Sequence, residues 1–114
     1  MLSPEIQQQL DLSREHLTHA ISRFAMASVI DRPSFEALRT TLPRFVESCR
    51  MVWLLPKDFL SALRSAQWQL SEGAKYSDDP AYVKEMALIL GRAFDSLLAG
   101  EGMDDRRPGV PRII

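Results

Sequence analysis

The sequence predicts an all-α protein arranged as an up-and-down four-helix bundle, and three observations lead to this class. Apolar residues recur at steps of three and four along four segments, the spacing that places side chains on one face of an α-helix. Residues that favour helix starts and stops lie at the ends of these segments. No stretch alternates polar and apolar residues in the way that a half-buried strand does.

The segment between residues 35 and 55 is predicted to form the centre of the bundle. Its apolar residues share one stripe of a helix: Phe35, Leu38, Leu42, Phe45, Cys49 and Val52. The end of the segment, from Met51 to Leu55, is apolar nearly all round, so it needs cover on more than one side. Proline lacks an N–H and clashes with the preceding turn, so we expect this second helix to be kinked or broken near Pro43.

The first helix is predicted to begin at Ser3, because serine is a favoured N-cap and a proline follows it at the first helical position. It should end near Ile30, since the residue before Pro33 is pushed out of the α region. Pro56 both ends the second helix and opens the third, so almost no loop is expected between them. The third helix weakens at Gly73.

The fourth helix has the clearest start in the chain, Asp79 followed by Pro80, and it should end at Gly100. Residues 1–100 are therefore predicted to be one helical bundle domain. Residues 101–114 have the composition of a flexible C-terminal tail. That tail nevertheless contains apolar residues that can be buried, namely Val110, Ile113 and Ile114.

Composition and charge exclude several classes of protein. The chain has 114 residues, of which 46% are hydrophobic and 25% charged, and its formal net charge is −1. This fits one globular domain without the basic excess of a nucleic-acid binder or the attraction to an anionic membrane. The apolar run from Met51 to Leu55 is too short to span a bilayer. With a single cysteine, Cys49, and no signal-peptide pattern, we expect a cytoplasmic location.

Two histidines, His16 and His19, lie three residues apart with Glu15 beside them, a spacing that can bind a metal on one helix face. On a helical wheel both histidines lie away from the apolar stripe of the first helix. We therefore interpret them as surface residues and predict no metal site and no cofactor.

The chain also resembles histidine phosphotransfer domains, which are four-helix bundles of similar size with an exposed histidine on a helix. In that family a lysine and a glycine follow the histidine and make room and countercharge for the phosphoryl group. Neither residue follows His16 or His19 here. The resemblance therefore concerns size and helix number, and it supplies an alternative function rather than a site.

No other residues form a recognisable catalytic group. Cys49 lies on the inner stripe of the second helix, where a cysteine acts as a small, inert hydrophobe. The arginines of the second and third helices alternate with acidic residues, as ordinary surface pairs do. The sequence contains no glycine-rich phosphate loop, no nucleophile elbow and no Cys-x-x-Cys motif.

The chain carries more apolar residues than one four-helix core can use, and this surplus favours an interaction surface. Leu12, Met26 and Ile30 lie on the side of the first helix away from its main stripe, and a contiguous apolar group of this kind marks an interface. The predicted interface residues are Leu12, Met26, Ile30, Trp53, Trp68, Val110, Ile113 and Ile114. We therefore predict a non-enzymatic interaction or regulatory module that forms a homodimer or binds a protein partner. The alternative is a small helical enzyme or a phosphotransfer-like protein.

Overall fold

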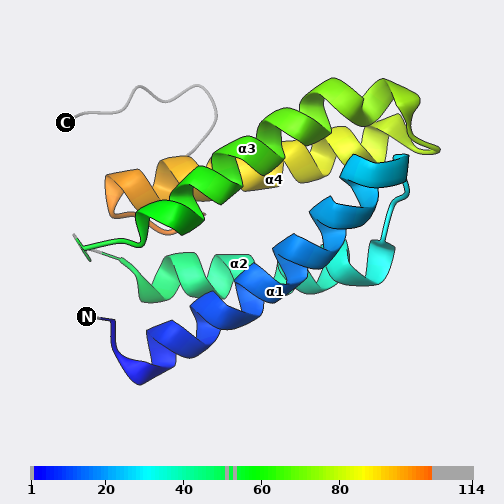
Figure 1. Ribbon diagram of the computed structural model, residues 1–114. Helices are drawn as coiled ribbons and strands as arrows, with labels where there is room; N and C mark the ends of the chain where they lie inside the picture. The colour runs from blue at the N-terminus through cyan, green and yellow to red at the C-terminus, as the bar shows by residue number, and fades with distance from the viewer. Residues whose placement is uncertain (1, 51, 53, 104–114) are drawn as a thin grey trace.

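The computed structural model describes residues 2–50, 52 and 54–103, and its regular elements are helices alone. Four α-helices follow one another along the chain, and a short 3-10 turn extends the third (Figure 1). Their bounds are α1 (Pro4–Ala27), α2 (Arg32–Ser48), α3 (Lys57–Gly73), η1 (Ala74–Tyr76) and α4 (Pro80–Ala99). The all-α class predicted from the apolar spacing is confirmed.

The helices form two antiparallel hairpins that pack on each other (Figure 1). α1 packs along α2 and α3 packs along α4, whereas α2 and α4 supply most of the contact between the hairpins. α1 and α3 touch over a much shorter stretch. The bundle is thus closed on the side of α2 and α4 and more open along the seam between α1 and α3.

Local capping explains three of the helix starts. The Ser3 hydroxyl accepts a 3.3 Å hydrogen bond from the N–H of Ile6, and Asp79 Oδ1 accepts one of 3.2 Å from the N–H of Tyr82. These caps confirm the predicted starts of the first and fourth helices. Asp31 caps α2 in the same way through the N–H of Ser34, and α2 begins at Arg32.

The ends of the helices agree less uniformly with the prediction. α4 stops at Gly100, whose φ of 71° is the left-handed conformation that glycine adopts without strain, as expected. α1 stops at Ala27 because Ser28 takes a left-handed φ of 55° and its N–H closes on the carbonyl of Phe24. The predicted end near Ile30 was therefore too late.

α2 runs without a break through Pro43, and a bend at that proline stays a prediction. The helix ends at Ser48, where the serine hydroxyl donates a 2.8 Å hydrogen bond to the carbonyl of Phe45. A helix reaching Leu55 would be longer by about 10 Å, at about 1.5 Å per residue. α3 begins only at Lys57, so the expectation of almost no loop between the second and third helices was wrong.

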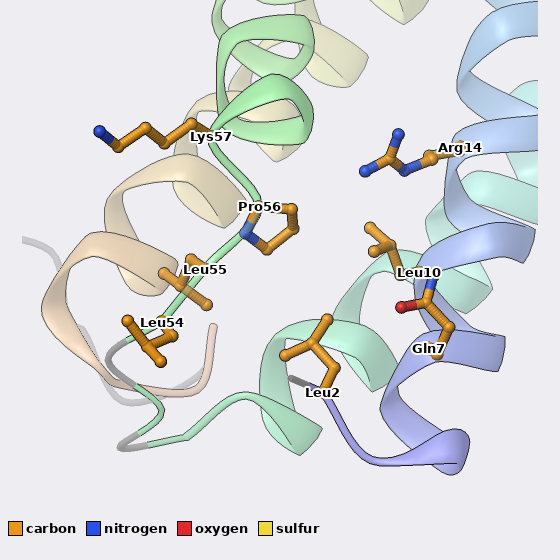
Figure 2. A pocket seen from close by; sticks show the side chains of 8 residues that line it. All are labelled: Leu2, Gln7, Leu10, Arg14, Leu54, Leu55, Pro56 and Lys57. Carbon is orange, nitrogen blue, oxygen red and sulfur yellow. The ribbon is translucent and has the colours of Figure 1, made fainter.

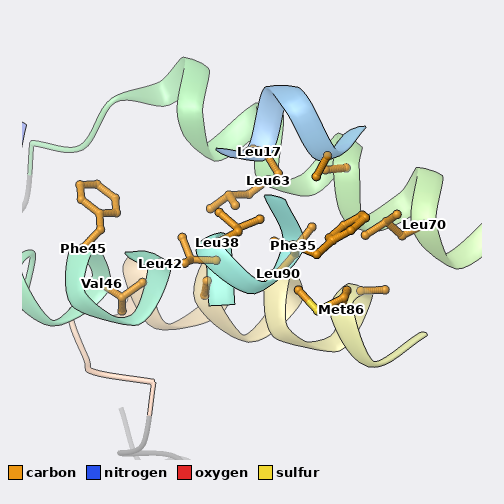
Figure 3. Packing of buried hydrophobic residues seen from close by; sticks show 14 of the residues in the cluster. Leu17, Phe35, Leu38, Leu42, Phe45, Val46, Leu63, Leu70, Met86 and Leu90 are labelled. Atoms are coloured by element: carbon orange, nitrogen blue, oxygen red, sulfur yellow. The ribbon is translucent and has the colours of Figure 1, made fainter. Parts of the chain in front are cut away.

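The predicted central stripe does form the middle of the core. The side chains of α2 that point inward are completely buried: Phe35, Leu38, Leu42, Phe45 and Val46. They meet residues of the other three helices, among them Leu17, Leu63 and Leu90 (Figure 3). The rings of Phe45 and Phe59 stand edge to face with centroids 5.4 Å apart. This packing joins the two hairpins into one core.

The chain continues to pack on the bundle just beyond the predicted boundary at Gly100. Met103 is buried and belongs to the hydrophobic core. Gly102 lies so close to Glu47 and Arg50, at the end of α2, that a Cβ atom there would meet their side chains at 2.4 and 2.6 Å. The remainder of the predicted tail, residues 104–114, is outside the described residues.

Candidate interaction surface

A network of charged and aromatic side chains links α2 to α4 and contains several titratable groups. The Tyr82 hydroxyl donates a 2.6 Å hydrogen bond to Glu36 Oε2. The guanidinium of Arg32 lies 4.4 Å from the centroid of the Tyr82 ring and donates to Asp79 at 2.9 Å. Arg39 forms a 2.9 Å ion pair with Glu85 and a second one with Glu36.

The pKa shifts in this network point to a structural role. Burial and the hydrogen bond to Glu36 raise the pKa of Tyr82 to about 12. The hydrogen bond from Arg32 lowers the pKa of Asp79 from its ordinary value. At neutral pH the phenol therefore stays protonated and the carboxylate stays charged, so each group keeps its partner. The network therefore links α2 to α4 through hydrogen bonds and ion pairs.

A second ion pair spans α1 and α3 beside a hollow at the end of the bundle. Arg14 donates two hydrogen bonds, of 2.7 and 3.0 Å, to the carboxylate of Asp58 and thereby lowers the pKa of Asp58. The hollow has a volume of about 380 Å³. Figure 2 shows Arg14 facing it, whereas the side chain of Lys57 extends away. It is lined by Leu2, Gln7, Leu10, Arg14, Leu54, Leu55, Pro56 and Lys57.

Two more hollows follow the seam between α1 and α3. The middle one, of about 270 Å³, has small or uncharged walls: Leu17, Thr18, Ile21, Ser22, Ala62, Ser65, Ala66 and Gln69. The third, of about 310 Å³, lies where α1 ends and is lined by Phe24, Ala25, Ser28, Trp68, Gln69, Glu72, Gly73 and Tyr76. The open seam therefore carries hollows from one end of α3 to the other.

Another hollow, of about 630 Å³, lies on the opposite side of α3, toward α4. Its walls are Ser61, Arg64, Ser65, Trp68 and Phe94. The Arg64 guanidinium lies 5.4 Å from the centroid of the Phe94 ring, so it is drawn toward α4. Trp68 lines this hollow as well as one in the α1–α3 seam, and its surface is 65% exposed.

These hollows flank an outward face of α3 that we name the α3 outer stripe, defined by the five exposed residues Lys57, Ser61, Ser65, Trp68 and Glu72. Steps of four and three residues place all of them on one face of the helix. The buried residues of α3 lie on the opposite face: Phe59, Leu63, Ala66 and Leu70. An exposed tryptophan thus stands on the face of α3 that is farthest from the core.

The residues predicted for the interface are found in different places. Leu12 is 36% exposed and Met26 is 87% exposed, but they are about 21 Å apart along α1, at about 1.5 Å per residue. His16, His19 and Arg23 lie on the helix between them. The two apolar side chains are therefore separate features of the surface rather than one patch.

Ile30 differs from the other two because it follows α1 instead of belonging to it. It lies partly buried against the core, so the helical wheel that grouped it with Leu12 and Met26 does not apply. Trp68 is exposed on the third helix. The other residues of the predicted interface lie outside the described residues: Trp53, Val110, Ile113 and Ile114.

The sequence pattern did not single out Ser61 and Ser65, because the predicted interface consisted of large apolar residues. A small polar residue on a helix surface is common in any sequence. Only the structure shows that these serines line hollows. Leu88 and Leu98, exposed on α4, were also missed because their segment is apolar on nearly every side. The sequence signal for these serines is a run of small residues between large ones on the outer face of a helix.

The structure also shows where the residues considered for metal binding and thiol chemistry lie. His19 is exposed and His16 is half-buried on α1, and the described residues contain no group of three or more side chains able to hold a metal ion. Cys49 is buried at the end of α2, and burial raises the pKa of its thiol to about 11. The thiol is therefore protonated at neutral pH and has the character of an inert core residue.

Comparison with known proteins found no match to the chain among family models, curated proteins or solved structures. Among the described helices, none combines the length and the apolar character that crossing a membrane requires. The geometry therefore defines the protein by class alone, as a small four-helix bundle with a tryptophan exposed between hollows on its third helix.

Proposed function

We propose that this protein is a non-enzymatic interaction module that binds a protein partner through the α3 outer stripe and the hollows beside it. The observation that carries the proposal is the position of Trp68, which is 65% exposed on the face opposite the core. Tryptophan is enriched among the residues that dominate protein–protein binding, because its large ring loses much apolar surface to water when a partner covers it.

The surroundings of Trp68 support contact with a protein. The hollows on either side can receive side chains, and the short side chains of Ser61 and Ser65 let a partner backbone come close to the helix. A formal net charge of −1 offers nucleic acid little attraction, which favours a protein as the partner. The buried thiol of Cys49 suits a reducing compartment, and the cytoplasm remains the proposed location.

A small enzyme or a phosphotransfer-like protein stays the alternative, and it rests on helix number and on the exposed His19. The ionic groups that bridge α2 and α4 are engaged with one another, as described above. The interaction module is therefore the function that the geometry supports best.

The test is site-specific photo-crosslinking in the native cells. A photoreactive amino acid at position 65, in the middle of the stripe, should give a discrete product with a protein. The same amino acid at position 88 is a matched control, because Leu88 is also an exposed helical residue, at 70%, but lies on α4. Adding Trp68→Asp should abolish the product at position 65. If position 65 gives no product, or gives the same products as position 88, the proposal is rejected.

A further inference from the structure

We infer that the partner is a second copy of this chain, bound by antiparallel pairing of the two α3 outer stripes about a two-fold axis. This inference rests on the proposed function and names its partner. The stripe is complementary to itself in charge and in size. Such self-complementarity is what a two-fold interface requires, because the same surface patch serves both subunits.

The spacing of the stripe sets the position of the axis. The separation between Lys57 and Arg64 along the chain equals the separation between Ser65 and Glu72. An axis that crosses α3 between Arg64 and Ser65, perpendicular to the helix, therefore places Lys57 of each copy opposite Glu72 of the other. The same axis places Ser61 of each copy opposite Trp68 of the other, while the serines at position 65 approach each other.

Charge favours this orientation over the parallel one. Lys57 and Glu72 are both exposed, and neither belongs to any of the ion pairs formed among the described residues. Figure 2 shows the Lys57 side chain extending away from the hollow toward which Arg14 points. Antiparallel pairing makes two Lys57–Glu72 contacts related by the axis. Parallel pairing would place Lys57 beside Lys57 and Glu72 beside Glu72, which is repulsive.

Size favours the same register. Trp68 of one copy would cover Ser61 of the other, at the hollow of about 630 Å³ that Ser61, Arg64 and Phe94 help to line. A large ring thus meets a small residue beside a hollow, twice in the interface. Arg64 borders the axis but is held toward the Phe94 ring of its own α4, 5.4 Å away, so the two guanidinium groups are drawn apart. The axis therefore brings neither two large side chains nor two like charges into direct opposition.

The charge test uses sedimentation equilibrium of the full chain across the micromolar range. Wild type should be dimeric at the upper end of the range. Lys57→Glu and Glu72→Lys should each weaken association about tenfold, because both symmetric contacts become repulsive. The double variant exchanges the two charges and should return association to the wild-type level. Association that stays weak in the double variant would overturn the proposed pairing.

The size test is independent of charge. Ser61→Trp places two large rings in opposition and Trp68→Ser removes the ring, so each should weaken association at least about tenfold. The double variant again places a tryptophan opposite a serine and should restore the dimer. Leu88→Ser is the matched control on α4 and should leave association unchanged. Far-ultraviolet circular dichroism checks that each variant keeps its helix content.

The outcomes separate this inference from the proposed function. A wild type that is monomeric throughout, together with a crosslink from position 65 to a different protein, overturns the second copy and leaves the interaction module standing. A monomer without any crosslink at position 65 overturns both. A dimer that responds to neither pair of exchanges has its interface elsewhere, which overturns the pairing proposed for α3.

Discussion

The hydroxyl of Tyr82 on α4 lies 2.6 Å from the carboxylate of Glu36 on α2 and donates a hydrogen bond to it. The Tyr82 ring also meets Phe35 edge to face, with centroids 6.1 Å apart, and lies under the guanidinium of Arg32. One side chain therefore joins the core to the ionic network on the surface. Because α2 and α4 provide most of the contact between the hairpins, this residue helps to hold the two halves of the bundle together.

Tyr82→Phe should lower the free energy of unfolding by about 1 kcal/mol, since it removes one hydrogen bond but keeps the ring. The measurement is urea denaturation of the variant, of Glu36→Gln and of the double variant. The double variant should lose less stability than the sum of the two single losses, because both single variants remove the same hydrogen bond. Strictly additive losses would show that the bond contributes nothing to stability.

The pH dependence of Tyr82 has a definite sign. Its pKa in the folded protein, about 12, is above the ordinary value of 10.0. The protonated phenol is therefore favoured by folding, and its contribution to stability is complete below pH 10.0 and is lost as pH rises toward about 12. In a Tyr76→Phe background, tyrosinate absorbance should titrate near 12 when folded and near 10.0 in denaturant. Identical titrations in the two states would contradict the raised pKa of Tyr82 in the folded protein.

Phe45→Ala should lower the free energy of unfolding by ~3–5 kcal/mol, as truncation of a large core aromatic does. Phe45 has no exposed surface, and its ring packs on Phe59 between the two hairpins. Chemical denaturation monitored by circular dichroism measures the loss. Thr40→Ala, at an exposed position on the same helix, is the control and should change stability little. A loss below about 1 kcal/mol for Phe45→Ala would mean that the aromatic core is not formed as described.

Met26→Glu distinguishes between α1 and α3 as the surface through which the protein associates. Met26 is 87% exposed on α1 and lies outside the walls of the hollows described along α3. If α3 forms the interface, this charge should leave the sedimentation of the protein unchanged, whereas Trp68→Ser should weaken association. The opposite result would return the interface to α1, where the sequence first suggested it.

The sequence alone determined those features that depend on neighbouring residues. Ser3 and Asp79 cap helices because their side-chain oxygens reach N–H groups only three residues ahead, and Gly100 ends α4 through its own backbone freedom. The burial of Phe35 and Phe45 follows from helical periodicity. Those signals are local, so they were readable before any helix was placed beside another.

Only the tertiary structure decided where α2 stops and which apolar residues remain exposed. The stripe from Phe35 continues to Val52 in the sequence, but α2 ends at Ser48 and the chain crosses to α3. Ile30 and Met26 were grouped on a helical wheel, yet one packs against the core and the other is exposed. Trp68 lines hollows on both sides of α3, one toward α1 and one toward α4, and both depend on how the helices pack. The physical reason is that burial depends on which helices cover a residue, and residues far apart in the chain supply that cover.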